Sequence, residues 1–223
     1  MFKKALFASA AVMAAGVASA EVTGNFAVVS DYIFRGADSS NGPAVQGGLD
    51  YSHASGLYAG VWMSNASLGT NSDQDEVDYY VGYGLGLNEN LSLDIGVVNY
   101  NTDANRGNDA GSATINEFYV GLAGEAWDAT IYVGDRGDDA GDADDYMYLD
   151  LNYGISTGET TSVDLHLGYT DEKADASADI IDIAITYNVG DFSIGATLQD
   201  IEDSTQDERA NLWIGWGTEF DVK

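Results

Sequence analysis

The chain has 223 residues, with 37 Asp and Glu against 8 Lys and Arg, which gives a formal net charge of −29. Such acidity argues against nucleic acid and against anionic membrane surfaces as partners. A hydrophobic content of 45%, with 14 Tyr and 4 Trp, argues against a disordered chain, and the absence of Cys leaves no disulfide framework.

Residues 1–20 have the form of a secretory signal peptide. Lys3 and Lys4 are followed by an apolar run over 5–17 and by the small residues Ala18-Ser19-Ala20. The run is shorter than the roughly 20 residues that a membrane helix needs. We therefore expect cleavage before Glu21 and a single mature domain over residues 21–223.

From residue 22 onward the chain alternates apolar residues with small or polar ones. Between 179 and 188, for example, Ile181, Ile183 and Ile185 alternate with Asp182 and Ala184. A period of two over eight or more residues predicts strands with two unlike faces. Twelve strands are expected, near residues 22–35, 43–53, 57–65, 76–87, 91–100, 115–123, 129–135, 145–155, 160–170, 179–188, 192–200 and 208–220.

The connections between these strands alternate between two kinds. Tight turns are expected at 54–56, 88–90, 124–128, 156–159 and 188–191, and longer loops at 36–42, 66–75, 101–114, 135–144, 171–178 and 201–207. With their immediate edges, the longer loops hold 21 of the 37 acidic residues. The pattern predicts an all-β, antiparallel, transmembrane up-and-down barrel with short periplasmic turns and longer acidic extracellular loops.

A soluble barrel or sandwich is the rival interpretation of the same alternation. Its polar face would be wet and rich in Lys and Glu, whereas the polar face here is mostly Gly, Ala, Ser and scattered Asp. Aromatic residues near strand ends are typical of membrane-interface girdles. The expected girdle consists of Tyr32, Phe34, Tyr83, Tyr153, Tyr187, Trp216 and Phe220.

The other strand face would line the lumen and set its selectivity. The expected lumen residues are Asp31, Arg35, Gln46, Asp50, Asp78, Asp94, Glu117, Asp150, Asp164, His166 and Asp182. Because carboxylates favour cations, this face predicts passive diffusion of small hydrophilic solutes that are cationic or neutral. The alternative is a plugged barrel in which the carboxylates pair around Arg35. One inward Arg cannot pair with all of them, but partial occlusion remains open.

The N-terminal region also resembles a known family. Ser30-Asp31-Tyr32-Ile33-Phe34-Arg35-Gly36, then Pro43-Ala44-Val45-Gln46-Gly47-Gly48-Leu49-Asp50-Tyr51, and then Ser55-Gly56-Leu57-Tyr58 with Trp62 are similar to the signature of TorF-family porins. The resemblance covers about a fifth of the chain. It implies a barrel in the outer membrane of a Gram-negative bacterium, surrounded by lipid and lipopolysaccharide. The chain departs from the usual aromatic end of such barrels, because Asp221-Val222-Lys223 follows Phe220.

Two other functions were weighed. The acidic segment 135–145, and Asn101, Asp103 and Asn105, offer oxygen ligands but lack the Gly and Glu positions of the twelve-residue calcium loop. No metal or cofactor is therefore expected, and a closed barrel acting as a surface, adhesion or divalent-cation-binding module through its acidic loops is the alternative. Catalysis is not expected, because His53 and His166 are the only His residues. No neighbouring strand offers a convincing Ser beside His166, and a structural role is expected for His53 beside a periplasmic turn. A monomer and a trimer both remain open.

Overall fold

The computed structural model describes residues 20–40, 42–65, 75–103, 113–136, 144–172, 179–201 and 209–222. The predicted signal peptide, apart from Ala20, lies outside these residues. So do most of the long acidic loops, including Asn105 and the centre of the candidate calcium segment at 135–145. Within the described residues, no helix is long and apolar enough to cross a membrane.

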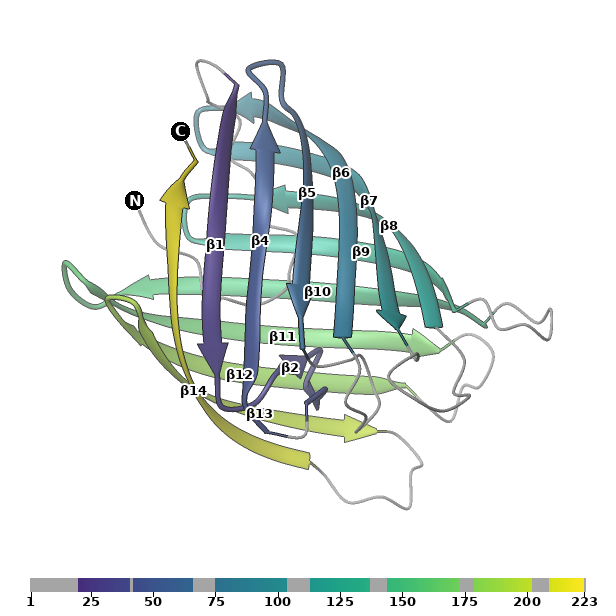
Figure 1. Ribbon diagram of the computed structural model, residues 1–223, viewed down its shortest axis with the longest axis vertical. Helices are drawn as coiled ribbons and strands as arrows, with labels where there is room; N and C mark the ends of the chain where they lie inside the picture. The colour runs from purple at the N-terminus through teal and green to yellow at the C-terminus, as the bar shows by residue number, and fades with distance from the viewer. Residues whose placement is uncertain are drawn as a thin grey trace.

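Twelve antiparallel strands form one closed barrel, which confirms the predicted fold class (Figure 1). Each strand pairs with its neighbours in the chain, and β1 closes the barrel by pairing with both β4 and β14. The strands are β1 (Glu21–Val29), β4 (Ala44–Ser52), β5 (Leu57–Ser64), β6 (Asp75–Asn88), β7 (Leu91–Asp103), β8 (Ala113–Ala123), β9 (Trp127–Arg136), β10 (Asp144–Ser156), β11 (Thr161–Glu172), β12 (Ile180–Val189), β13 (Phe192–Ile201) and β14 (Arg209–Asp221).

The first predicted strand, 22–35, is wrong in its second half. β1 ends at Val29, which pairs with Ala44 at the start of β4, and the described residues from Asp31 to Ser40 leave the barrel wall. Two short strands, β2 (Ile33–Phe34) and β3 (Ala37–Asp38), form a separate hairpin there. Arg35 and Gly36, with φ values of +48° and +78°, form the turn of this hairpin, a backbone conformation that an extended strand does not adopt.

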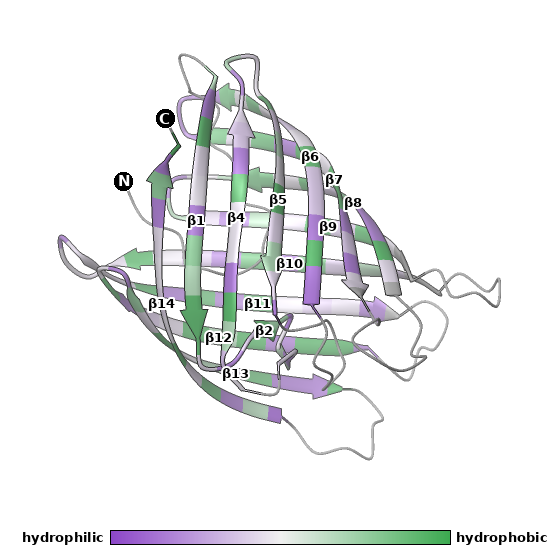
Figure 2. Ribbon diagram, in the orientation of Figure 1, coloured by the Kyte–Doolittle hydropathy of each residue, from purple (hydrophilic) through white to green (hydrophobic). Residues whose placement is uncertain are grey.

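The two faces of the wall differ as the alternation predicts. On β12, Ile181, Ile183 and Ile185 are exposed on the outside, whereas Asp182 and Thr186 are buried on the inside. Figure 2 shows the same alternation of hydrophobic and hydrophilic residues along the other strands. The buried apolar core lies inside the barrel and is built mainly from Tyr side chains. An exposed apolar outer face of this kind requires a nonaqueous environment.

Five of the seven predicted girdle residues face outward. Tyr83, Tyr153, Tyr187 and Phe220 are exposed, and Trp216 packs edge-on against the outward Phe26 with ring centroids 6.3 Å apart. All five lie in the half of their strand nearer the short-turn rim. The prediction is wrong for Tyr32, which is 3% exposed, and for Phe34, because both belong to the segment that leaves the wall.

Aromatic rings on the inner face lie flat over glycines of the neighbouring strand. Each pair occupies directly opposite positions, and a Cβ on the glycine would collide with the ring. The glycines therefore make room for aromatic side chains rather than leaving the lumen wide. The pairs are Tyr58 over Gly82, Tyr80 over Gly60, Tyr119 over Gly96, Tyr146 over Gly134 and Trp213 over Gly195.

Gly82→Ala should therefore destabilise the barrel by about 1–3 kcal/mol, because the new methyl group displaces the Tyr58 ring and weakens its buried hydrogen bond to Asp94. Gly154→Ala is the matched control, since a Cβ there would meet nothing closer than 3.4 Å. Urea unfolding of the barrel in lipid vesicles measures both. Equal losses in the two variants would contradict the packing argument.

Candidate functional site in the lumen

The chain between β1 and β4 folds back into the barrel. Residues 32–40, here called the inner hairpin, contain β2 and β3. Phe34 pairs with Ala37, so Arg35 and Gly36 form a two-residue turn with positive φ at both positions, as a type I′ turn requires. The base is closed by two hydrogen bonds, from Ser39 N to Tyr32 O at 2.7 Å and from Tyr32 N to Ser40 Oγ at 2.7 Å.

The inner hairpin contacts opposite sides of the wall. Near its base, Tyr32 packs against Trp62 of β5 with ring centroids 5.6 Å apart. At its tip, the side-chain amide of Gln199 on β13 donates to Arg35 O at 3.2 Å, and that of Asn211 on β14 donates to Gly36 O at 3.4 Å. Gly36 lies so close to Asp182 of β12 that a Cβ would collide with it. The hairpin therefore spans the lumen.

Arg35 projects from the tip into a cage of aromatic rings. Its guanidinium donates to both oxygens of Glu117 on β8, from Nη1 to Oε1 at 2.6 Å and from Nη2 to Oε2 at 2.8 Å. The guanidinium carbon lies 4.1 Å from the ring centroid of Tyr148, 5.1 Å from that of Tyr132 and 5.8 Å from that of Tyr146. A bidentate ion pair with cation–π contacts is among the strongest ways to hold a guanidinium.

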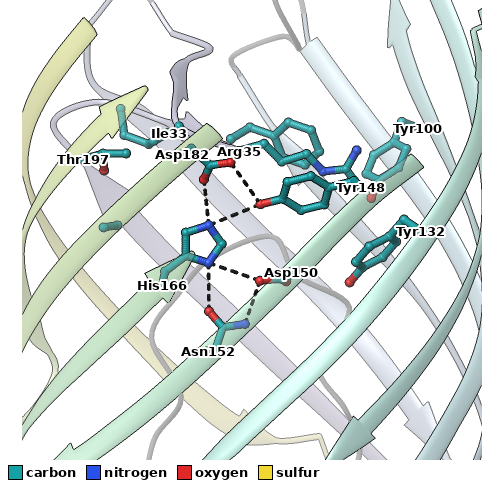
Figure 3. Close-up of a pocket in the computed structure, with 13 residues that line it drawn as sticks. Ile33, Arg35, Tyr100, Tyr132, Tyr148, Asp150, Asn152, His166, Asp182 and Thr197 are labelled. Carbon is teal, nitrogen blue, oxygen red and sulfur yellow. Dashed lines mark hydrogen bonds and ion pairs between the residues drawn. The ribbon is translucent and has the colours of Figure 1, made fainter. Parts of the chain in front are cut away.

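On the other side of Tyr148, His166 lies between two carboxylates (Figure 3). Its Nε2 is 2.7 Å from Oδ1 of Asp182, and its Nδ1 is 3.1 Å from Oδ1 of Asp150. Asn152 joins the cluster, with its Oδ1 2.9 Å from Nδ1 of His166 and its Nδ2 donating to Asp150 at 2.8 Å. Both ring nitrogens face acceptors, an arrangement that an imidazolium satisfies with a donor on each.

A cavity of about 50 Å³ lies between the Arg35 cage and the His166 cluster. Tyr100, Tyr132, Tyr148, Asp150 and Asp182 are among the residues that line it, together with Arg35. The space holds a few water molecules and is too small for a sugar or an amino acid. The inner hairpin and the rings around Arg35 therefore fill much of the lumen at this level.

The inward carboxylates are paired largely without cations. Tyr58 donates to Asp94 at 2.7 Å, the amide of Asn188 donates to Asp164 at 2.7 Å, and Tyr80 donates to Asp50. Glu117 accepts further hydrogen bonds from the phenols of Tyr100 and Tyr146. Phenols and amides, rather than further arginines, therefore serve as donors to these carboxylates. These bonds leave the negative charge of the wall uncompensated.

Most predicted lumen residues lie on the inner face. These are Gln46, Asp50, Asp78, Asp94, Glu117, Asp150, Asp164, His166 and Asp182 on the strands and Arg35 on the inner hairpin. The structure does not place Asp31 on a strand. It lies half-buried in the bend after β1.

The expected set of lumen residues omits Tyr100, Tyr146 and Glu76, which the structure places on the inner face. Tyr100 and Tyr146 are buried in the lumen, and strand parity could have found them, since Tyr146 is two residues before Tyr148. Glu76 was counted with the acidic loops but lies on β6 and is fully buried. Burial, with the nearby charges of Glu76 and Asp78, raises the pKa of the Tyr32 phenol well above its usual value.

A closed wall of strands with an apolar outer face and a polar inner face defines a porin-type β-barrel. The chain belongs to the Gcw_chp family, described as bacterial proteins of unknown function, whose model matches residues 13–214. A comparison with curated proteins finds no match.

Several solved structures to which this chain is similar are described as porins. The KdgM porin superposes with a TM-score of 0.56 at 8% identity, over 90% of this chain and 99% of that one. The KdgM porin in complex with disordered oligogalacturonate gives 0.52 at 7% identity, over 91% and 99%. The NanC porin gives 0.49 at 13% identity, over 91% and 100%. The likeness to KdgM establishes the shared fold.

Proposed function

We propose that the protein is an outer-membrane channel for small hydrophilic solutes, with a preference for cations over anions. The observation that carries the proposal is the acidic inner wall of a closed barrel whose outer face is apolar. Carboxylates along a narrow passage attract cations and repel anions. We place the chain in the outer membrane of a Gram-negative bacterium, in contact with lipid and lipopolysaccharide, after export by the predicted signal peptide. We also propose that the chain is related to the TorF-family porins that its N-terminal region resembles.

The proposed solute differs in charge from one found with a structural neighbour. One KdgM porin structure is described as a complex with disordered oligogalacturonate, which is a polyanion. The wall of the present barrel carries Asp94, Glu117, Asp150, Asp164 and Asp182, and a polyanion would be repelled by them. We therefore carry over the barrel from that comparison and not the solute.

We propose that this arrangement is a closed state of the channel. The inner hairpin crosses the lumen, and its contacts with β12, β13 and β14 consist of two hydrogen bonds and the packing of Gly36. Displacement of the hairpin toward the loop rim would open the passage. The filled lumen equally favours a second candidate function, in which a permanently closed barrel acts through its acidic loops. Conductance distinguishes the two candidates, because only the channel would ever conduct.

Ion selectivity tests the charge argument. The protein in planar bilayers with a KCl gradient should show discrete steps and a reversal potential on the cation-selective side. Asp164→Asn should move that potential toward zero, because Asp164 is a half-buried carboxylate of the inner wall. Glu89→Gln removes the same charge from an exposed turn and should leave the potential unchanged. A chain that never conducts, even without its inner hairpin, would contradict the channel.

A further inference from the structure

Most of the cage around Arg35 belongs to the barrel strands, whereas the ring of Phe34, 4.8 Å from the guanidinium carbon, belongs to the inner hairpin. Glu117 on β8, Tyr132 on β9, and Tyr146 and Tyr148 on β10 are all strand residues, fixed by the barrel. The phenols of Tyr100 and Tyr146 donate to Glu117 and orient its carboxylate. If the hairpin withdrew, these strand residues would form an acidic pocket with aromatic walls on the path through the lumen.

The geometry of the pocket matches one kind of cation closely. The two contacts from Arg35 to Glu117, at 2.6 and 2.8 Å, use the planar fork of a guanidinium, and Tyr148 packs 4.1 Å from its central carbon. An alkali cation or a quaternary ammonium has no N–H donors for the two carboxylate oxygens, and a primary amine has no planar face to stack. Guanidinium compounds satisfy both parts of the wall.

Arg35 itself is an imperfect occupant. It has a positive φ, a conformation that L-residues other than Gly rarely adopt, in a turn whose backbone is held by two long hydrogen bonds. A free guanidinium would make the same contacts without that backbone strain. Beside the cage, the cavity lined by Asp150, Asn152 and Asp182 offers hydrogen-bond acceptors for a polar group carried by the same solute.

We propose that Glu117, Tyr132, Tyr146 and Tyr148 form a binding site for guanidinium-bearing organic cations, in which Arg35 is a tethered stand-in that such a solute displaces. The proposed binding depends only on the residues of the cage. Its consequence, that binding releases the inner hairpin and admits the solute, rests on the proposed channel function.

Binding is tested with the full chain refolded in detergent micelles. Arg35→Ala empties the cage, and methylguanidinium chloride is the probe, with equal concentrations of sodium chloride and tetramethylammonium chloride as controls for ionic strength. Isothermal titration calorimetry and the temperature of the heat-induced shift in gel mobility are the two measurements. Methylguanidinium should bind saturably to Arg35→Ala and raise its transition temperature, whereas the two control salts should not.

The double variants locate the site. Arg35→Ala with Glu117→Gln should lose saturable binding, whereas Arg35→Ala with Asp164→Asn, which removes an inward carboxylate outside the cage, should keep it. Equal behaviour of the two double variants, or a response to all three salts, would overturn the proposal. Binding in micelles without conductance in bilayers would support the binding site and contradict the channel function. Conductance without binding would support the channel function and contradict the binding site.

Discussion

Excision of the inner hairpin should convert a closed barrel into a conducting one. Val29 and Ala44 are directly paired at the ends of β1 and β4, so residues 30–43 can be replaced by an Asn-Gly turn without altering the register of the wall. The excised segment carries every described hairpin contact across the lumen, including those of Arg35 and Gly36. We expect single-channel conductance in planar bilayers to rise several-fold above that of the intact chain, with longer open times.

A reversible version of the experiment separates opening from misfolding. The chain contains no Cys, and a Cβ at Gly36 would lie 3.2 Å from Cβ of Gln199, close to the separation that a disulfide bridges. Because a Cβ at Gly36 also meets Cβ of Asp182, the pair is made in an Asp182→Gly background, in which Gly36→Cys with Gln199→Cys should tie the hairpin to β13 when oxidised and release it when reduced. Current that appears only after reduction, with the single variants unaffected by the reductant, would support the hairpin as the obstruction. The same low current in the excised and intact chains would contradict it.

The second large effect concerns the outer wall. Ile183→Arg should destabilise the barrel in lipid vesicles by about 2–4 kcal/mol, because Ile183 is 44% exposed on the outer face near the middle of β12, where a charge faces the hydrocarbon centre. Val189→Arg is the matched control in the same strand and on the same face, at the short-turn end, and should cost about 0–1 kcal/mol.

Urea titrations in vesicles measure both free energies of unfolding. The difference between the two positions is the diagnostic result, since it depends on depth in a bilayer rather than on loss of an Ile or a Val. Equal costs in vesicles would show that β12 does not cross the hydrocarbon layer, and the membrane assignment would then fail.

The wall could be predicted because its signal is local. Strand parity needs only a period of two, and it placed Asp94, Asp164 and Asp182 on the inner face correctly. The inner hairpin was missed for the same reason. Tyr32 and Phe34 continue the alternation of β1, and only Arg35-Gly36 interrupts it, so the local pattern predicts a longer strand. Their inward path depends on contacts with β5, β8 and β13, which no local pattern encodes.

The chemistry of the lumen was harder to predict than its composition. Strand parity predicts Asp94 on the inner face, but its hydrogen bond from Tyr58 joins residues 36 positions apart on strands that are not adjacent. Glycines belong to the predicted polar face, and cross-strand pairing covers several of them with rings from the next strand. Both features depend on side chains that reach beyond their own strand.

The attachment of Arg35 to Glu117 couples the size of the passage to its electric field. While the hairpin is in place, its guanidinium neutralises the carboxylate of Glu117. When the tip withdraws, the lumen becomes wider and gains one uncompensated negative charge at its narrowest level. Conductance and cation selectivity should therefore rise together, so that the open barrel excludes anions more strongly than the barrel with its hairpin in place.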